Sequence, residues 1–197
     1  YSVLEKEKRT TSPSEIDVLL WTDQPFYRPR DLVTINVSVD KACHLTLIDI
    51  DLTLARSLIG AYSGKVAMFE QPVQHIDPAV FDALEDGDIL FIDSPHILKA
   101  DSDLNHLVFN VLPQLKSGVR VHFHDIFWPF EYPDGWTISE NRSWNEVYAL
   151  RAYLTDNKRW KLVWFNDYFA KLETARARKD CADFLRNSGG ALWLVRK

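Results

Sequence analysis

Acidic and imidazole side chains recur at the ends of three strands that the sequence predicts: Asp49, then Asp93 with His96, then His124-Asp125. In a parallel sheet the carboxyl ends of neighbouring strands meet at one edge, where ligands bind. Asp93 and Asp125 would therefore approach each other if their strands are neighbours. Two carboxylates that close together require a cation or a shared proton.

Mg²⁺ suits such a pair of carboxylates, because it prefers oxygen ligands, keeps several waters and tolerates only one or two protein carboxylates. His96 lies three residues after Asp93 and could then act as a general base toward a hydroxyl group, since imidazole titrates near neutral pH. The structural alternative is that the aspartates cap helices or turns and that the histidines are satisfied in the core. Their recurrence at successive strand ends favours a site, because such groups cluster at functional sites.

Alternating strands and helices must position these residues. After Asp49 the apolar spacing predicts strands at 66–69, 88–93, 119–123, 160–165 and 191–195. It predicts helices at 54–61, 78–84, 103–115 and 144–154, and a mainly helical segment at 169–185. This order is typical of an α/β fold, a parallel sheet with crossover helices.

The first 43 residues have a different pattern. Residues 1–15 are polar and are expected to form a flexible lead, whereas the segments 16–20 and 32–39 predict two antiparallel strands around a loop with two prolines. A third strand is expected at 44–48. About 30 β residues are too few for an independent domain, so we expect residues 16–43 to pack on or complete the main sheet of residues 44–197.

Charge and composition exclude several classes of function. The chain has 23 Lys and Arg against 28 Asp and Glu, a net charge of −5, which argues against a basic nucleic-acid binder. It has no apolar run near the ~20 residues of a membrane helix and no signal-peptide pattern. Cys43 and Cys181 lie in no metal-binding motif. We expect a cytoplasmic protein with a small-molecule partner and no nucleic-acid or membrane partner, and a homo-oligomer stays open.

Four segments carry a resemblance to a known family: DILFIDSPHILKADSDLN, LPQLKSGVRVHFHDIFWPFEYP, WNEVYALRAYL and GGALWLVRK. They resemble a bacterial branch of the class I S-adenosylmethionine-dependent methyltransferases over about residues 44–197. The core pattern is similar to that of metal-dependent sugar and small-molecule O-methyltransferases. It consists of a strand-end Asp and His, an Asp on the next helix, a glycine turn and a strand ending in His-Asp: Asp93, His96, Asp103, Gly118, His124 and Asp125.

This resemblance implies a Rossmann-like methyltransferase sheet and Mg²⁺-assisted methyl transfer to a hydroxyl of a sugar or other small molecule. His96 would be the base, Asp93 and Asp125 would be metal ligands, and His124 would be a further ligand. In this family an acid at the place of Asp49 binds the ribose hydroxyls of the cofactor. The cofactor-binding residues that the resemblance implies are Asp49, Gln74 and Asp93.

The chain departs from the family at its beginning. Class I methyltransferases start with a strand, a glycine-rich turn and a helix, but none of the seven glycines of this chain precedes His44. Residues 16–51 instead resemble a β-rich domain of unknown function from bacterial surface proteins and lipoproteins. HLTLIDID fits both patterns, which indicates a junction between two ancestries, natural or engineered. A missing first strand and helix could also lie in a segment outside this sequence.

Two other functions are open at this point. A catalytically inactive binding or structural module would explain the absent glycine motif. A metal-dependent hydrolase would use His122, His124 and Asp125, but the sequence offers it no nucleophile. The aromatic loop at 127–136 is either a substrate wall or a set of core plugs, because long loops are often functional and these rings must be buried somewhere.

Overall fold

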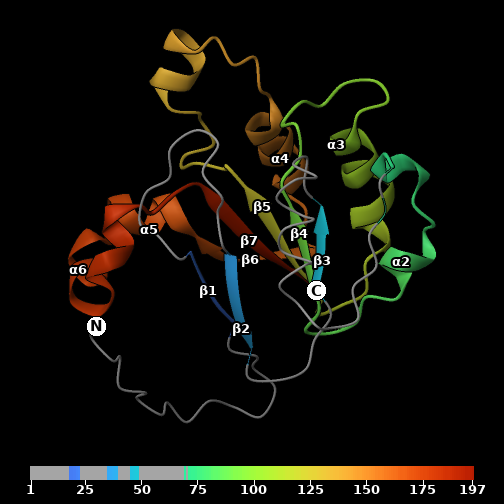
Figure 1. Ribbon diagram of the computed structural model, residues 1–197, viewed down its shortest axis with the longest axis horizontal. Coiled ribbons are helices and arrows are strands. Elements are labelled where there is room, and N and C mark those ends of the chain that lie inside the picture. The colour runs from blue at the N-terminus through green and yellow to red at the C-terminus, as the bar shows by residue number, and fades with distance from the viewer. Residues whose placement is uncertain (1–17, 23–34, 40–44, 49–68, 70) are drawn as a thin grey trace.

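The computed structural model describes residues 18–22, 35–39, 45–48, 69 and 71–197, and it has the α/β character that the sequence predicts (Figure 1). A five-stranded sheet lies at its centre, in the order β3-β4-β5-β7-β6. Its strands are β3 (Leu45–Ile48), β4 (Ile89–Ile92), β5 (Arg120–His124), β6 (Trp160–Phe165) and β7 (Ala191–Arg196).

The sheet is mixed, whereas the sequence pattern predicts a parallel one. Strands β3, β4 and β5 are parallel, but β7 runs antiparallel to both β5 and β6. Phe165 at the end of β6 pairs with Leu192 near the start of β7, so the chain re-enters the sheet at the end where it left. The intervening helices α5 (Asn166–Leu172) and α6 (Thr174–Asp180) stay at that end instead of crossing back over the sheet (Figure 1).

Three helices contribute to a single core on one face of the sheet. They are α2 (Ala79–Asp82), the segment that begins with α3 (Asp103–His106), and α4 (Glu146–Leu154). Alternate residues of the central strands face them, as expected for strands with a period of two. The buried cluster joins these strand residues to the helices and includes Phe81, Leu90, Ile92, Leu104, Val121, Phe123, Leu150, Leu192 and Leu194.

The predicted helix at 103–115 is helical from Asp103 to Gln114 but changes pitch along its length. After α3 it widens into a π-helical turn at Leu107–Val111 and then tightens into a 3₁₀ turn at Leu112–Gln114. Pro113 offers no N–H and its ring crowds the carbonyl four residues earlier, so an α-helix cannot continue through it. The predicted apolar face is nevertheless buried: Leu104, Leu107, Val108, Val111 and Leu112.

The C-terminal helical segment is broken into short pieces. After α5 and α6 the chain forms a 3₁₀ turn at Ala182–Arg186, where the sequence predicts a mainly helical stretch. The loop after β5 contains a π-helical turn at Gly135–Ser139, the gold helix that projects at the top of Figure 1.

The N-terminal part is described only in its strands. The first two, β1 (Val18–Thr22) and β2 (Ile35–Val39), pair antiparallel as predicted and form a two-stranded sheet of their own. The predicted helix at 54–61 and nearly all of the predicted strand at 66–69 lie outside the described residues. The role of residues 16–43 as a segment of the main domain therefore stays a prediction.

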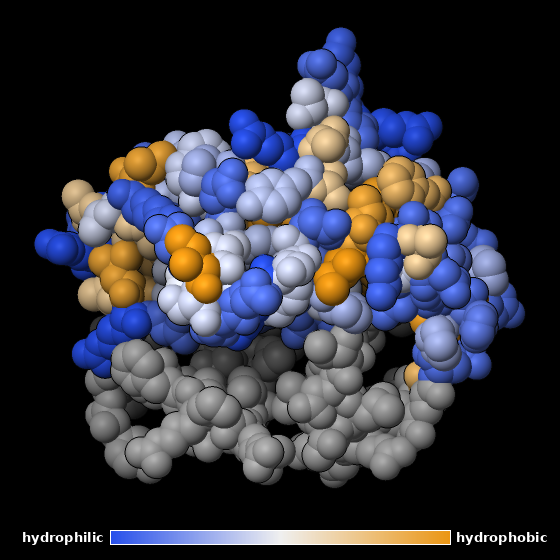
Figure 2. Space-filling view, turned by 90° about the horizontal axis from the view of Figure 1, so that it is seen from above, coloured by the Kyte–Doolittle hydropathy of each residue, from blue (hydrophilic) through white to orange (hydrophobic). Residues whose placement is uncertain are grey.

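The surface of the described part is mixed in polarity. Hydrophobic residues come to the surface in separate patches among hydrophilic ones (Figure 2). None of the helices within the described ranges is both long enough and apolar enough to cross a membrane.

Candidate active site

His96 lies on the loop after β4, and its imidazole ring is buried. Its Nδ1 lies 2.6 Å from Oε2 of Glu146, the first residue of α4. The Ser94 hydroxyl donates to the same oxygen at 3.4 Å and accepts from the His96 backbone N–H at 3.2 Å. We assign the ring proton to Nδ1, because an ionised carboxylate can only accept a hydrogen bond. This leaves Nε2 as the basic atom.

Two aspartates flank Nε2 of His96. Oδ1 of Asp93 lies 3.6 Å from it and Oδ2 of Asp125 lies 3.8 Å from it. Each aspartate directly follows its strand, β4 or β5, and these strands are parallel neighbours. The sheet therefore brings Asp93, His96 and Asp125 together at one edge, where the sequence places them. Both distances are longer than that of a hydrogen bond to the ring nitrogen.

The backbone is strained at two of these residues. His96 and Asp125 have φ angles of 58° and 57°, in the left-handed region that residues with a Cβ avoid. The His96 carbonyl accepts the N–H groups of Asn145 and Glu146 at 3.0 and 3.2 Å, and the Asp125 N–H donates to the Gly190 carbonyl at 2.7 Å. The start of α4 and the start of β7 thus hold both conformations. Asp101, Phe130, Asn141 and Asp156 have positive φ angles as well, so this conformation fixes the backbone of the site but does not by itself mark it.

The carboxylates make His96 a stronger base than a buried histidine would otherwise be. Burial lowers its pKa, but the hydrogen bond and charge of Glu146, and then the charges of Asp125 and Asp93, outweigh burial and raise the pKa above 6.5. Burial also raises the pKa of Glu146, and the hydrogen bond with His96 opposes this. The pair can therefore accept a proton at Nε2 near neutral pH.

Aromatic rings cover the imidazole. The Trp144 ring lies 4.3 Å from that of His96, and Trp136 and Tyr132 pack on Trp144 at 5.4 and 5.7 Å between ring centroids. The Arg142 guanidinium lies 4.5 Å from the ring centroids of both Trp136 and Trp144. Tyr132 is buried and most of the aromatic loop packs against the core, so the rings of this loop mainly fill space in the hydrophobic core. Trp144 is the ring that meets the site.

The chemistry of Asp93 and Asp125 fits a hard cation. Both carboxylates are partly exposed, at 30% and 21%, and approach the same nitrogen. In the part of the chain that the structure describes, no three or more His, Cys, Asp or Glu side chains are grouped to hold a metal ion. Mg²⁺ needs only one or two protein carboxylates, because waters and substrate oxygens complete its shell.

The other predicted ligands lie farther out. Nε2 of His124 is 3.4 Å from Oδ1 of Asp125, so His124 contacts one predicted metal ligand, and its own role as a ligand stays a prediction. Gln74 donates to the backbone carbonyl of Asp101 at 2.8 Å, on the loop that carries His96, and its Oε1 is buried without a partner among the described residues. Asp49 lies outside the described residues.

His122 does not join this cluster. Its ring stacks on Phe91 at 4.2 Å and meets the edge of Trp193 at 4.7 Å, on the sheet face opposite the core. Burial, and secondarily the neighbouring His124, lowers its pKa well below 6.5, so the ring is neutral. Neither ring nitrogen has a hydrogen-bond partner within the described ranges. The hydrolase hypothesis groups His122, His124 and Asp125. His124 lies against Asp125 and its ring centroid is 5.9 Å from that of His122, but the buried His122 ring nitrogens bond neither of them, so the hypothesis stays a prediction.

The sequence does not reveal the partner that holds His96. Glu146 lies 50 residues away, and an acid in the first turn of a helix is ordinarily explained by the helix dipole. Trp144 and Asn145 are predicted to be helical but precede α4, because the Asn145 side chain bonds both the N–H and the carbonyl of Leu98. Only the folded chain shows that this helix start closes over His96.

No protein-family model, curated protein or solved structure matches this chain. The geometry around His96 and the pattern of the sequence are therefore the grounds on which a function can be proposed.

Proposed function

We propose that this chain transfers a methyl group from S-adenosylmethionine to a hydroxyl of a sugar or other small molecule, with Mg²⁺ and with His96 as the general base. The observation that carries the proposal is the setting of His96, with Nδ1 on the buried Glu146 and Nε2 within 4 Å of Asp93 and Asp125. The resemblance of residues 44–197 supplies the reaction class and the Rossmann-like methyltransferase fold.

His96 would take up the proton of the acceptor. As the hydroxyl oxygen bonds to the methyl carbon, its proton moves to Nε2 and the imidazole becomes a cation. Glu146 stabilises that cation through Nδ1–H and keeps the ring oriented, as the carboxylate of a catalytic triad does. Trp144 covers one side of the ring and limits its access to water.

Asp93 and Asp125 would hold the metal ion, which when bound lowers the pKa of a coordinated hydroxyl group. Asp49, Gln74 and Asp93 would bind the cofactor, which contributes an electrophilic methyl group on its sulfonium sulfur and leaves as S-adenosylhomocysteine. Positioning acceptor and donor in line is the remaining contribution of the protein.

Calorimetric titration with S-adenosylmethionine and S-adenosylhomocysteine, each with and without Mg²⁺, tests the cofactor part of the proposal. We expect micromolar binding, about −8 kcal/mol. Formation of S-adenosylhomocysteine is then followed with a panel of sugars and small alcohols.

Two substitutions test the catalytic part. His96→Ala and Asp93→Asn should each abolish turnover without changing the circular dichroism spectrum. The control is His106→Gln, which replaces a histidine of α3 outside the cluster and should retain wild-type turnover. Turnover retained by both site variants would refute the role of His96 as the base.

The second candidate is a non-catalytic binding or structural module, favoured by the absence of a glycine before His44. The same titration separates the two functions. A cooperatively folded chain that gives neither heat nor a thermal shift with either ligand would exclude the enzyme and leave the module.

A further inference from the structure

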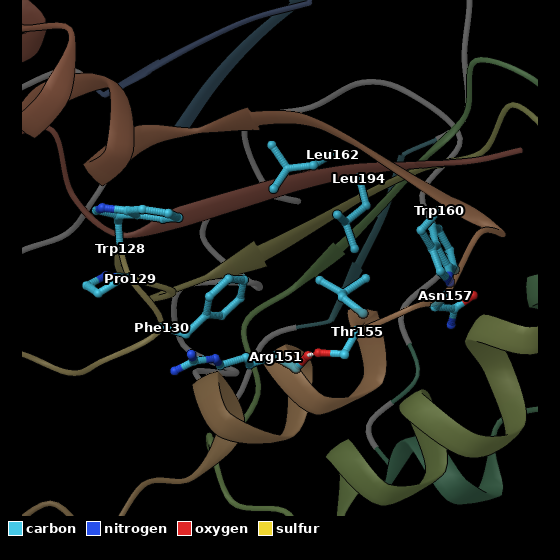
Figure 3. A pocket seen from close by; sticks show the side chains of 10 residues that line it. Trp128, Pro129, Phe130, Arg151, Thr155, Asn157, Trp160, Leu162 and Leu194 are labelled. Carbon is cyan, nitrogen blue, oxygen red and sulfur yellow. Dashed lines mark hydrogen bonds between the residues drawn. The ribbon is translucent and has the colours of Figure 1, made fainter.

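A cleft of about 430 Å³ opens beside the edge strand of the sheet, and its lining includes no residue of the candidate active site (Figure 3). Its floor includes Leu194 of β7 and Leu162 of the edge strand β6, which are paired in the sheet. Trp128 and Phe130, from the loop after β5, and Trp160, at the start of β6, form its walls. The last turn of α4 closes the remaining side. The cleft therefore lies between the end of α4 and the sheet, beside the connection that leads from α4 to β6.

The lining of the cleft is apolar except at one side. Arg151 of α4 is its charged residue, and its guanidinium lies beside Phe130 in Figure 3. The ion pairs within the described part of the chain include none to Arg151. The lining thus combines aromatic and aliphatic walls with an exposed cation that no described carboxylate neutralises.

The size and exposure of the cleft suit a small molecule. Its volume lies in the range of about 300–1,000 Å³ that is usual for small-molecule sites. Leu162 is 50% exposed although its partner Leu194 is 1% exposed, so part of the apolar floor faces solvent. Covering that floor removes apolar area from water, which favours a ligand with a hydrocarbon body.

We propose that this cleft is a second binding site, specific for a small aromatic carboxylate. The carboxylate pairs with Arg151, and the ring system packs between Phe130 and Leu162. Guanidinium groups bind carboxylates through two parallel hydrogen bonds, which gives the anion a defined orientation. None of the residues assigned to methyl transfer lines the cleft, so the site is independent of the proposed function.

The test compares two probes of nearly equal shape, 2-naphthoate and the neutral 2-naphthylmethanol, by ligand-observed NMR and calorimetry on the full chain. We expect the wild-type chain to bind naphthoate about tenfold more tightly than the alcohol, which corresponds to about 1.4 kcal/mol. Arg151→Gln should remove this preference and leave alcohol binding unchanged. Phe130→Ala should weaken both probes by a similar factor.

Arg159→Gln is the matched control, because Arg159 is an exposed arginine close in sequence to Arg151 that does not line the cleft. It should bind both probes as the wild-type chain does. Equal affinity for the two probes, or equal loss in both arginine variants, would overturn the proposal. An absence of naphthoate binding at millimolar concentration would overturn it as well. Sedimentation then tests whether a second copy fills the cleft, in which case the wild-type chain is a dimer that Phe130→Ala dissociates.

Discussion

Glu146 is the neighbour that most strongly raises the pKa of His96. A buried histidine without a carboxylate partner is held neutral and is a weak base, as the lowered pKa of His122 shows in the same sheet. At His96 the hydrogen bond and charge of Glu146, together with the charges of Asp125 and Asp93, outweigh burial. Two buried histidines in adjoining parts of the structure therefore have pKa values shifted in opposite directions, because only His96 has carboxylate neighbours, of which Glu146 acts most strongly.

Glu146→Gln should lower the pKa of His96 from its raised value to below 6.5, because burial then acts with only the weaker charges of Asp125 and Asp93 against it. The folded-state pKa of His96 is raised, so its contribution to stability is full below pH 6.5 and is lost as the pH rises through the folded-state pKa. The substitution should therefore destabilise the fold more at pH 6 than at pH 9.

NMR titration of the imidazole Cε1–H, assigned with His96→Ala, measures this pKa directly, and urea unfolding at the two pH values measures stability. Glu131→Gln is the control, since Glu131 bonds the exposed Tyr148 hydroxyl and not His96. A His96 midpoint that stays above 6.5 in Glu146→Gln would show that the two aspartates set the pKa.

The sequence locates Asp93, His96 and Asp125 but not Glu146, for a physical reason. Residues at the ends of adjacent parallel strands are brought together by the sheet itself, so alternation and strand order suffice to predict their meeting. Glu146 reaches His96 only because the Asn145 side chain bonds Leu98 and sets the start of α4 on the loop after β4. A single contact between a loop and the start of a helix produces no periodic pattern of apolar residues from which it could be predicted.

At the scale of elements, local patterns predict where strands and helices lie better than how they are joined. The strand at 160–165 is found at those residues, and the expected glycine turn at Gly118 precedes β5. The reversal of β7 escapes prediction, because strand periodicity is the same in either direction. The pitch change after α3 has a visible cause in Pro113, but one proline does not predict a π-helical turn.

Gly118 is the residue that this turn requires. Its φ is +88°, its N–H donates to the Arg196 carbonyl at 2.8 Å, and an added Cβ would overlap the Asp86 side chain. Gly118→Ala should lower the free energy of unfolding by about 1–3 kcal/mol, from left-handed strain plus displacement of Asp86. Thermal unfolding measures this loss as a shift of roughly 2–4 °C for each kcal/mol.

Gly135→Ala is the control for the loss of a glycine as such, because no atom lies within 4 Å of the position of its added Cβ and its φ is not positive. It should keep the wild-type stability or raise it by up to about 1 kcal/mol, because alanine loses less backbone entropy on folding than glycine does. If both variants unfold at the wild-type temperature, the start of β5 tolerates a side chain at Gly118 and the turn is not constrained as described.

At the scale of the whole molecule, the edge of the sheet at β6 is apolar and exposed in the part of the chain that the structure describes. Strand β6 ends the five-stranded order, and three consecutive residues on it, Leu162, Val163 and Trp164, are exposed by 50%, 52% and 39%. Edge strands normally carry charges or prolines that prevent pairing with another chain. The only charged residue of β6 is Lys161, its second residue, and an apolar run follows it.

Whether the chain forms a homo-oligomer, which the sequence leaves open, can be tested at this edge. Val163 lies at the register shift between Leu162 and Trp164 and is half exposed, so Val163→Lys should leave stability within about 0.5 kcal/mol of the wild type. A lysine there opposes edge-to-edge pairing, so the wild-type chain should self-associate at tens of micromolar in sedimentation velocity and Val163→Lys should not. Asn187→Lys adds the same charge at an exposed residue outside β6 and should self-associate like the wild type. A wild-type chain that stays monomeric throughout would mean that this edge does not pair despite its apolar run.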